Sequence, residues 1–178
     1  MQRNHIWTIL GAMVLSAAMA GRAHATDISG TITTTLTIIS NSQLIGDVTC
    51  QVTGAPCIVI QNPYGFFGIH PTLDLNGFTI TGLADPQTAC GAGGANNSET
   101  GIAVSGQGGV IIRGPGIVQS FRGFGINFSN VSSSSITGVT TAGNCFSGIF
   151  MTAGSANNVL EGNISIRNGN LTNPCGGI

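Results

Sequence analysis

Charged side chains are scarce in this sequence of 178 residues. Only 6% of the residues are charged, and the basic ones are five arginines with no lysine. A protein that binds nucleic acid carries clustered basic residues, so we expect no nucleic-acid partner. Hydrophobic residues make up 42% of the chain. That fraction excludes an intrinsically disordered protein, even though low charge alone would not.

Long apolar runs are missing after Ala25, where none approaches the roughly 20 residues of a membrane-spanning helix. The N-terminus differs, because Arg3 precedes an apolar stretch over residues 6–20 and the small residues around Ala25. This pattern predicts a cleavable signal peptide over residues 1–25, and hence a secreted, periplasmic or envelope protein with no membrane segment after cleavage. The alternative is an uncleaved anchor, against which the short apolar stretch speaks.

Cysteine is the one residue type whose count predicts covalent structure. Export permits disulfides, and the five cysteines are Cys50, Cys57, Cys90, Cys145 and Cys175. We expect a local Cys50–Cys57 bridge and a Cys145–Cys175 bridge between successive turns, with Cys90 left over. The other use of cysteine is a zinc site, but the chain has no CxxC or HxxxH pair, so we expect no metal or cofactor.

A repeated pattern occupies the second half of the chain. Its copies open at Gly101-Ile102, Gly125-Ile126, Gly148-Ile149 and Gly177-Ile178, with isoleucines 24, 23 and 29 residues apart. Two further short apolar segments follow each of the first three opening pairs, as at Val110-Ile111-Ile112 and Ile117-Val118. A period in the twenties with three short β-type segments is typical of a β-solenoid, in which each repeat stacks on the next.

The repeat predicts an all-β domain of about six turns with three strands each, over residues 50–178. Equivalent side chains should stack into two inner columns, Ile102, Ile126, Ile149 and Ile178 in one and Val104, Phe128 and Met151 in the other. Residues 26–49 lack the repeat and are expected to cap the N-terminal end with strands. Because the sequence stops as a new copy opens, we expect the chain to be truncated at its C-terminus.

Particular residues carry a resemblance to a known family. They are the run from Leu73 to Gly82, the Gly114-Pro115-Gly116-Ile117 turn with Phe121, and asparagines at turns, among them Asn130, Asn157 and Asn158. Together they resemble the right-handed parallel β-helix repeat proteins, which include secreted pectate-lyase-like polysaccharide lyases and hydrolases and envelope proteins linked to copper delivery. The resemblance implies a right-handed parallel β-helix; at the turns, asparagine adopts left-handed backbone or forms side-chain ladders.

Groups for catalysis are few, so we expect no catalytic residue in this chain. A glycosidase needs two close carboxylates and a lyase needs clustered carboxylates with a basic residue, whereas the acidic residues here are scattered. We therefore expect a non-catalytic structural or carbohydrate-binding module. The alternative is the N-terminal half of a lyase or glycoside hydrolase that is completed downstream. A copper-delivery protein is a second alternative, disfavoured because His70 is the one histidine after the signal peptide.

One outward row of side chains is a candidate polysaccharide-binding surface. Its predicted members are Asn76, Arg113, Thr137 and Glu161, which fall at equivalent positions of successive turns. Such a row is otherwise an ordinary solvated face. A long insertion over residues 84–100 should project from the stack, and loops of this kind often carry function. The sequence leaves the oligomeric state open.

Overall fold

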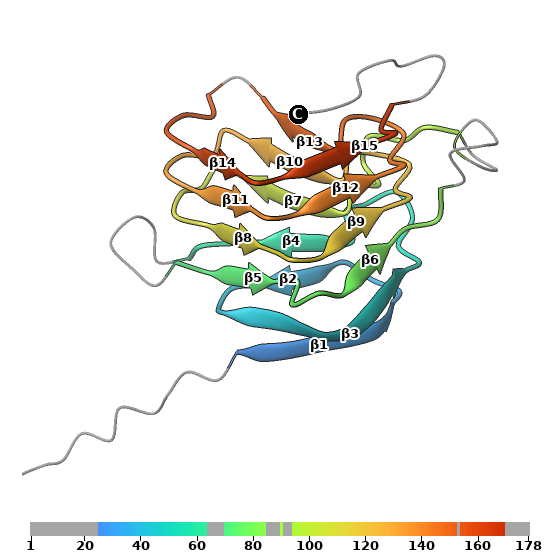
Figure 1. Ribbon diagram of the computed structural model, residues 1–178, viewed down its shortest axis with the longest axis horizontal. Coiled ribbons are helices and arrows are strands. Elements are labelled where there is room, and N and C mark those ends of the chain that lie inside the picture. The colour runs from blue at the N-terminus through green and yellow to red at the C-terminus, as the bar shows by residue number, and fades with distance from the viewer. Residues whose placement is uncertain (1–24, 64–69, 85–89, 91–93, 153, 170–178) are drawn as a thin grey trace, which may run out of the picture.

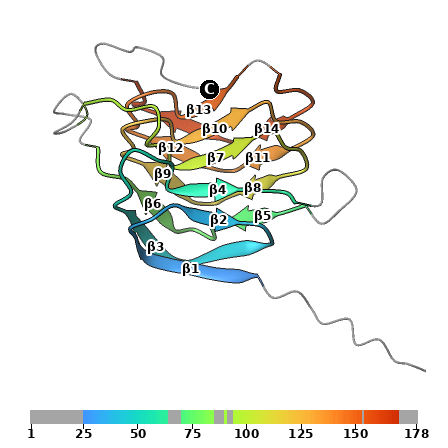
Figure 2. The same cartoon turned by 180° about the vertical axis from the view of Figure 1, so that it is seen from behind.

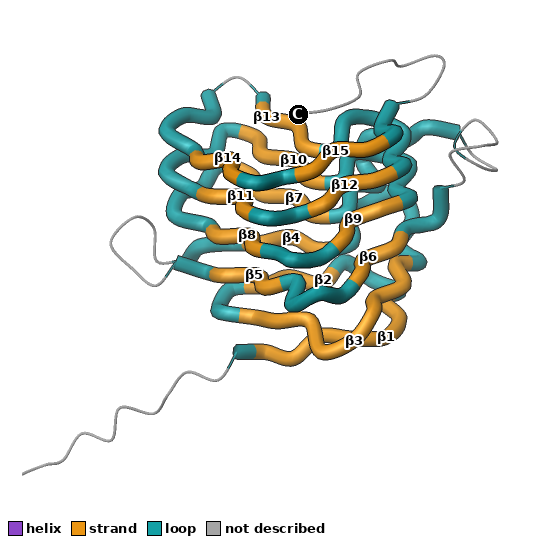
Figure 3. The backbone as a smooth tube through the Cα atoms, viewed as in Figure 1, coloured by secondary structure: helices purple, strands orange, loops and turns teal. Residues whose placement is uncertain are grey.

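The chain forms parallel strands that stack into sheets, with no helix in the part that the structure describes (Figures 1 and 3). The structure is a computed structural model and describes residues 25–63, 70–84, 90, 94–152 and 154–169. The predicted signal peptide, apart from Ala25, lies outside these residues. The all-β prediction is confirmed.

The strands are arranged as three faces, here called the first, second and third. The first face holds β5 (Thr72–Asp74), β8 (Ile111–Arg113), β11 (Ser135–Thr137) and β14 (Val159–Glu161). The second holds β6 (Thr79–Thr81), β9 (Ile117–Gln119), β12 (Thr140–Ala142) and β15 (Ile164–Ile166). The third holds β2 (Leu36–Ile38), β4 (Ile58–Ile60), β7 (Ile102–Ser105), β10 (Ile126–Ser129) and β13 (Ile149–Met151).

Two longer strands form the base of the stack. β3 (Ser42–Cys50) pairs with both β5 and β6, so it continues the first and second faces in one strand. β1 (Thr26–Ile32) pairs with β3 on its other side. Residues 26–49 thus supply β1, β2 and β3 at one end, as Figure 2 shows from behind.

Every described strand pairing is parallel and links a strand to its equivalent one turn away. On the third face Ile102 pairs with Ile126, and Ile126 pairs with Ile149. This is the predicted inner column for the described residues; Ile178 lies outside them. The arrangement is consistent with a β-solenoid, and the three-strand period read from the sequence is confirmed.

Aliphatic side chains fill the space between the three faces. Ile58, Ile102 and Ile126 are fully buried on the third face, and Ile112 and Ile136 on the first. The second predicted column is also in register, since Phe128 pairs with Val104 below and Met151 above. Burial of such columns stabilises the stack by roughly 25 cal/mol for each Å² of apolar surface removed from water.

The glycine that opens each repeat is required by close stacking. A Cβ on Gly101 would lie 2.6 Å from the carbonyl oxygen of Gly125, and one on Gly125 would lie 2.5 Å from that of Gly148. No side chain tolerates such a contact with backbone. The glycine of each Gly-Ile pair therefore lies where the backbone of one turn closely approaches that of the next.

Three asparagines of the last described turn clamp the turn beneath. The side-chain oxygens of Asn158, Asn163 and Asn168 accept from backbone N–H groups 24 residues earlier, and their amides donate to carbonyls 27 residues earlier. Asn130 and Asn157 instead adopt left-handed backbone, with φ of 55° and 56°. Both expected uses of asparagine are present.

Candidate functional site

A row of outward polar side chains crosses the first face and continues onto the base. Strand register places Gln43 beside Asp74, Asp74 beside Arg113, Arg113 beside Thr137 and Thr137 beside Glu161. We call these five residues the polar row. Neighbouring strands lie about 4.8 Å apart, so the row offers a hydrogen-bonding group at each such step.

The row contains three of the four residues expected from the sequence. The fourth expectation, Asn76, is wrong, because Asp74 occupies its place. The sequence placed Asn76 level with Arg113, but the structure pairs Leu73 with Ile112, and so puts Asp74 beside Arg113. Asn76 lies in a turn with φ of 48°, and its amide donates to the carbonyl of Leu44. It therefore holds the turn and takes no part in the row.

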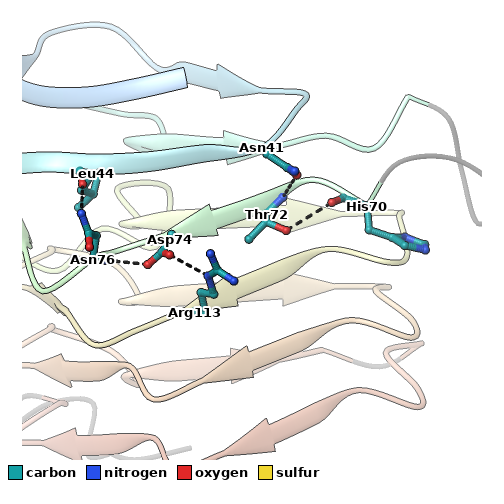
Figure 4. Close-up of polar contacts among 7 residues, drawn as sticks. All are labelled: Asn41, Leu44, His70, Thr72, Asp74, Asn76 and Arg113. Carbon is teal, nitrogen blue, oxygen red and sulfur yellow. Dashed lines mark hydrogen bonds and ion pairs between the residues drawn. The ribbon is translucent and has the colours of Figure 1, made fainter. Parts of the chain in front are cut away.

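Asp74 and Arg113 form an ion pair at the centre of the row (Figure 4). Arg113 Nε lies 2.8 Å from Asp74 Oδ2, and the other carboxylate oxygen accepts from the backbone N–H of Asn76. The Arg113 side chain is 57% exposed. A surface pair of this kind contributes at most about 1 kcal/mol, so the guanidinium can exchange partners with a ligand at little cost.

Two hollows lie on the first face, and the ion pair lines one of them. One, of about 180 Å³, is lined by Asn41, Gln43, Thr72, Asp74 and Arg113 together with Ala25 and Ser42. The other, of about 340 Å³, has His70, Ile111, Ser135, Asn157 and Val159 among its lining residues. Figure 4 shows the His70 imidazole beyond Thr72 and directed away from the ion pair, so His70 does not join the polar row.

The disulfides agree with the sequence for one bridge and correct the other. Cys50 is bonded to Cys57 as expected, whereas Cys145 is bonded to Cys90. The predicted Cys145–Cys175 bridge is therefore wrong. The turn period of 24 residues stacks Asn168 on Asn144, which leaves Gly169 over Cys145. Cys175 comes six residues later, outside the described part of the chain.

The insertion over residues 84–100 is tied to the stack through its last residues, which the sequence did not reveal. Glu99 and Arg122 form a two-pronged ion pair, with both N–O distances 2.5 Å and side-chain exposures of 6% and 14%. Glu99 also accepts from the backbone N–H of Gly54 and the amide of Asn96. This buried carboxylate is fully engaged in holding the loop, and it is not placed to act on a substrate.

An aromatic cluster on the surface was also missed. The rings of Phe124 and Phe150 are stacked with centroids 4.5 Å apart, and Phe146 lies 5.2 Å from Phe124. None of the three belongs to the apolar core. Three further aromatic residues, Tyr64, Phe66 and Phe67, lie outside the described residues.

Neither a metal-binding cluster nor a membrane-spanning helix occurs among the described residues. No group of three or more His, Cys, Asp or Glu side chains there lies close enough to hold a metal ion. The described residues also contain no helix of the length and hydrophobicity needed to cross a membrane.

Comparison of the chain with protein-family profiles, with curated proteins and with solved structures finds no significant match. The geometry of the site therefore carries the functional argument.

Proposed function

We propose that this chain is an exported right-handed parallel β-helix protein that acts as a non-catalytic structural or carbohydrate-binding module of the cell envelope or the extracellular space. Its signal peptide would be residues 1–25. The two disulfides support an oxidising compartment, because such bonds are rare in reducing ones. The stacked parallel strands support the β-helix, and the resemblance of the turn sequences supports its hand.

The polar row is the observation that carries the carbohydrate proposal. It runs perpendicular to the strands, and every strand it crosses contributes one side chain that donates or accepts hydrogen bonds. A linear polymer laid along the row would meet such a group about every 4.8 Å. Sugar chains are linear polymers that carry hydroxyl groups at short, regular intervals, and these hydroxyls can bond the side chains of the row.

The order of charges in the row favours binding over hydrolysis. Asp74 and Glu161 are separated by Arg113 and Thr137, and hence by three strand steps or about 14 Å. Paired carboxylates of glycosidases stand about 5–10 Å apart. Asp74 is also paired with Arg113, so one of its carboxylate oxygens is already engaged by a protein group.

The test is retardation of the secreted chain in native gels that contain polysaccharide, after a glycan array has selected the polymer. We expect Arg113→Ala to weaken binding about tenfold or more, since a hydrogen bond to a charged group contributes about 1.5–3 kcal/mol. Thr137→Ala should weaken it less. Thr140→Ala is the matched control, because Thr140 is half-buried like Thr137 but lies on the second face.

Two results would contradict the proposal. Wild-type affinity in the Arg113 and Thr137 variants would remove the polar row from binding. Release of unsaturated or reducing ends from a polyuronide by the purified chain would show catalysis. Recovery of the protein outside the cytoplasm with Thr26 as its first residue would confirm the export signal.

A further inference from the structure

Phe150 is the one phenylalanine among the exposed large apolar side chains of the described residues. Phe150 projects outward from β13, is 36% exposed, and stacks on Phe124 with an interplanar angle of 5°. Stacking onto a second ring fixes the orientation of the exposed one. The result is an aromatic surface of fixed orientation beside β13, the last described strand of the third face, and Figure 2 shows where that strand lies in the stack.

Polar side chains surround this ring in a regular grid. Strand register places Phe150 beside Asn127, and the Thr152 hydroxyl donates to the Ser129 hydroxyl at 3.2 Å in the next outward position. The four residues thus form two adjacent outward pairs on neighbouring turns. We call Phe124, Asn127, Ser129, Phe150 and Thr152 the phenyl patch.

Asn127 supplies a second and independent observation. Its side-chain oxygen is buried and has no hydrogen-bond partner, which is costly for a carbonyl oxygen. Rotation of the amide toward solvent beside Phe150 would let an external hydroxyl or N–H satisfy it. Asn127 and Phe150, which are neighbours in strand register, thus place a side-chain oxygen without a partner beside an apolar ring.

Charge separates this patch from the polar row. The five strands of the third face contain no Asp, Glu, Lys, Arg or His. A ligand bound there gains nothing from carrying charge. The patch is also small, with one exposed ring among hydroxyl and amide groups, whereas a stable protein interface buries about 800 Å² on each partner.

From these observations we infer that the phenyl patch is a second carbohydrate-binding surface, which takes a neutral, hydroxyl-rich sugar unit. The C–H face of the sugar packs on Phe150, while its hydroxyls bond Asn127 and the Ser129–Thr152 pair. This inference rests on the proposed function but not on the polar row. The two surfaces lie on different faces and are separable by mutation.

The experiment uses native gels containing hydroxyethylcellulose as the neutral probe and polygalacturonate as the acidic one. We expect Phe150→Ala to reduce retardation by hydroxyethylcellulose about tenfold and to leave that by polygalacturonate unchanged. Asn127→Ala should weaken neutral-polymer binding without lowering thermal stability, because it removes an unsatisfied group. Ile164→Ala is the control, since Ile164 is 52% exposed on the same turn but on the second face.

Each outcome decides a different question. Undiminished hydroxyethylcellulose binding in the Phe150 variant, or equal loss in the Ile164 variant, would overturn the phenyl patch and leave the proposed function standing. Binding of polygalacturonate alone by the wild-type chain would do the same. Binding of neither polymer would also overturn the phenyl patch, while the proposed function would still be decided by the glycan array and the Arg113 variant.

Discussion

Replacement of Asn144 by alanine should be among the most destabilising single changes that leave the apolar core intact. Asn144 is 1% exposed at the corner between the second and third faces. Its side-chain oxygen accepts from the Phe121 N–H at 3.0 Å, and its amide donates to the Val118 carbonyl at 3.1 Å and to Asn168 at 2.9 Å.

The magnitude follows from the groups left behind. Asn144→Ala leaves the buried Phe121 N–H without the Asn144 oxygen, at a cost of about 1–3 kcal/mol, and loses the two hydrogen bonds that the amide donates to Val118 and Asn168, at about 0.5–1.5 kcal/mol each. The free energy of unfolding should therefore fall by about 2–5 kcal/mol, out of about 5–15 kcal/mol for a typical domain. At a urea dependence of about 2 kcal/mol per molar, the midpoint should drop by about 1–2.5 M.

Urea unfolding followed by circular dichroism measures this, with two further variants. Asn144→Asp keeps the shape and the acceptor but loses both donations, so it should be about as destabilised as the alanine variant. Asn157→Gly is the control: Asn157 is exposed with positive φ, and glycine adopts that conformation freely. A midpoint for Asn144→Ala within 0.2 M of wild type, roughly 0.4 kcal/mol, would refute the reasoning.

Other predictions concern the corner that holds the insertion. Cys90→Ser opens a bridge spanning 55 residues and should cost about 4 kcal/mol by loop-closure entropy, measured by thermal unfolding. If the Cys90–Cys145 bond is present, peptide mapping without reduction will find the two cysteines in one fragment; a Cys145–Cys175 fragment would contradict it. Arg122→Met leaves the Glu99 carboxylate buried without its partner and should cost about 3–5 kcal/mol. Adding Glu99→Gln should restore part of that loss, and no recovery would show that packing rather than charge dominates there.

The sequence predicted the stacked columns because their signal is local and repeated. Ile102, Ile126 and Ile149 each follow a glycine at nearly constant spacing, and the structure pairs them in register. The polar row was predicted less well, since Asn76 was assigned where Asp74 lies. A slip of two residues preserves the alternation of inward and outward side chains, so the hydrophobic pattern cannot detect it.

The contacts of the insertion could not be predicted for a different reason. A repeat specifies what lies above and below each position, but residues 84–100 have no equivalent in the other turns. Their partners, Arg122 for Glu99 and Cys145 for Cys90, depend on the path of the loop through space. The aromatic cluster was not predicted because Phe124, Phe146 and Phe150 occupy three different positions of the repeat.

The asparagine clamps also bear on how such a chain can change its length. Each clamp reaches back by a constant 24 and 27 residues, so an in-frame tandem copy of one 24-residue segment would carry its own clamp and find its acceptors already in place. A gene duplication of that size would extend the protein by one turn and would require no change in the sequences of the adjacent turns. The architecture can therefore grow or shrink in whole increments, and its outer surfaces lengthen with it.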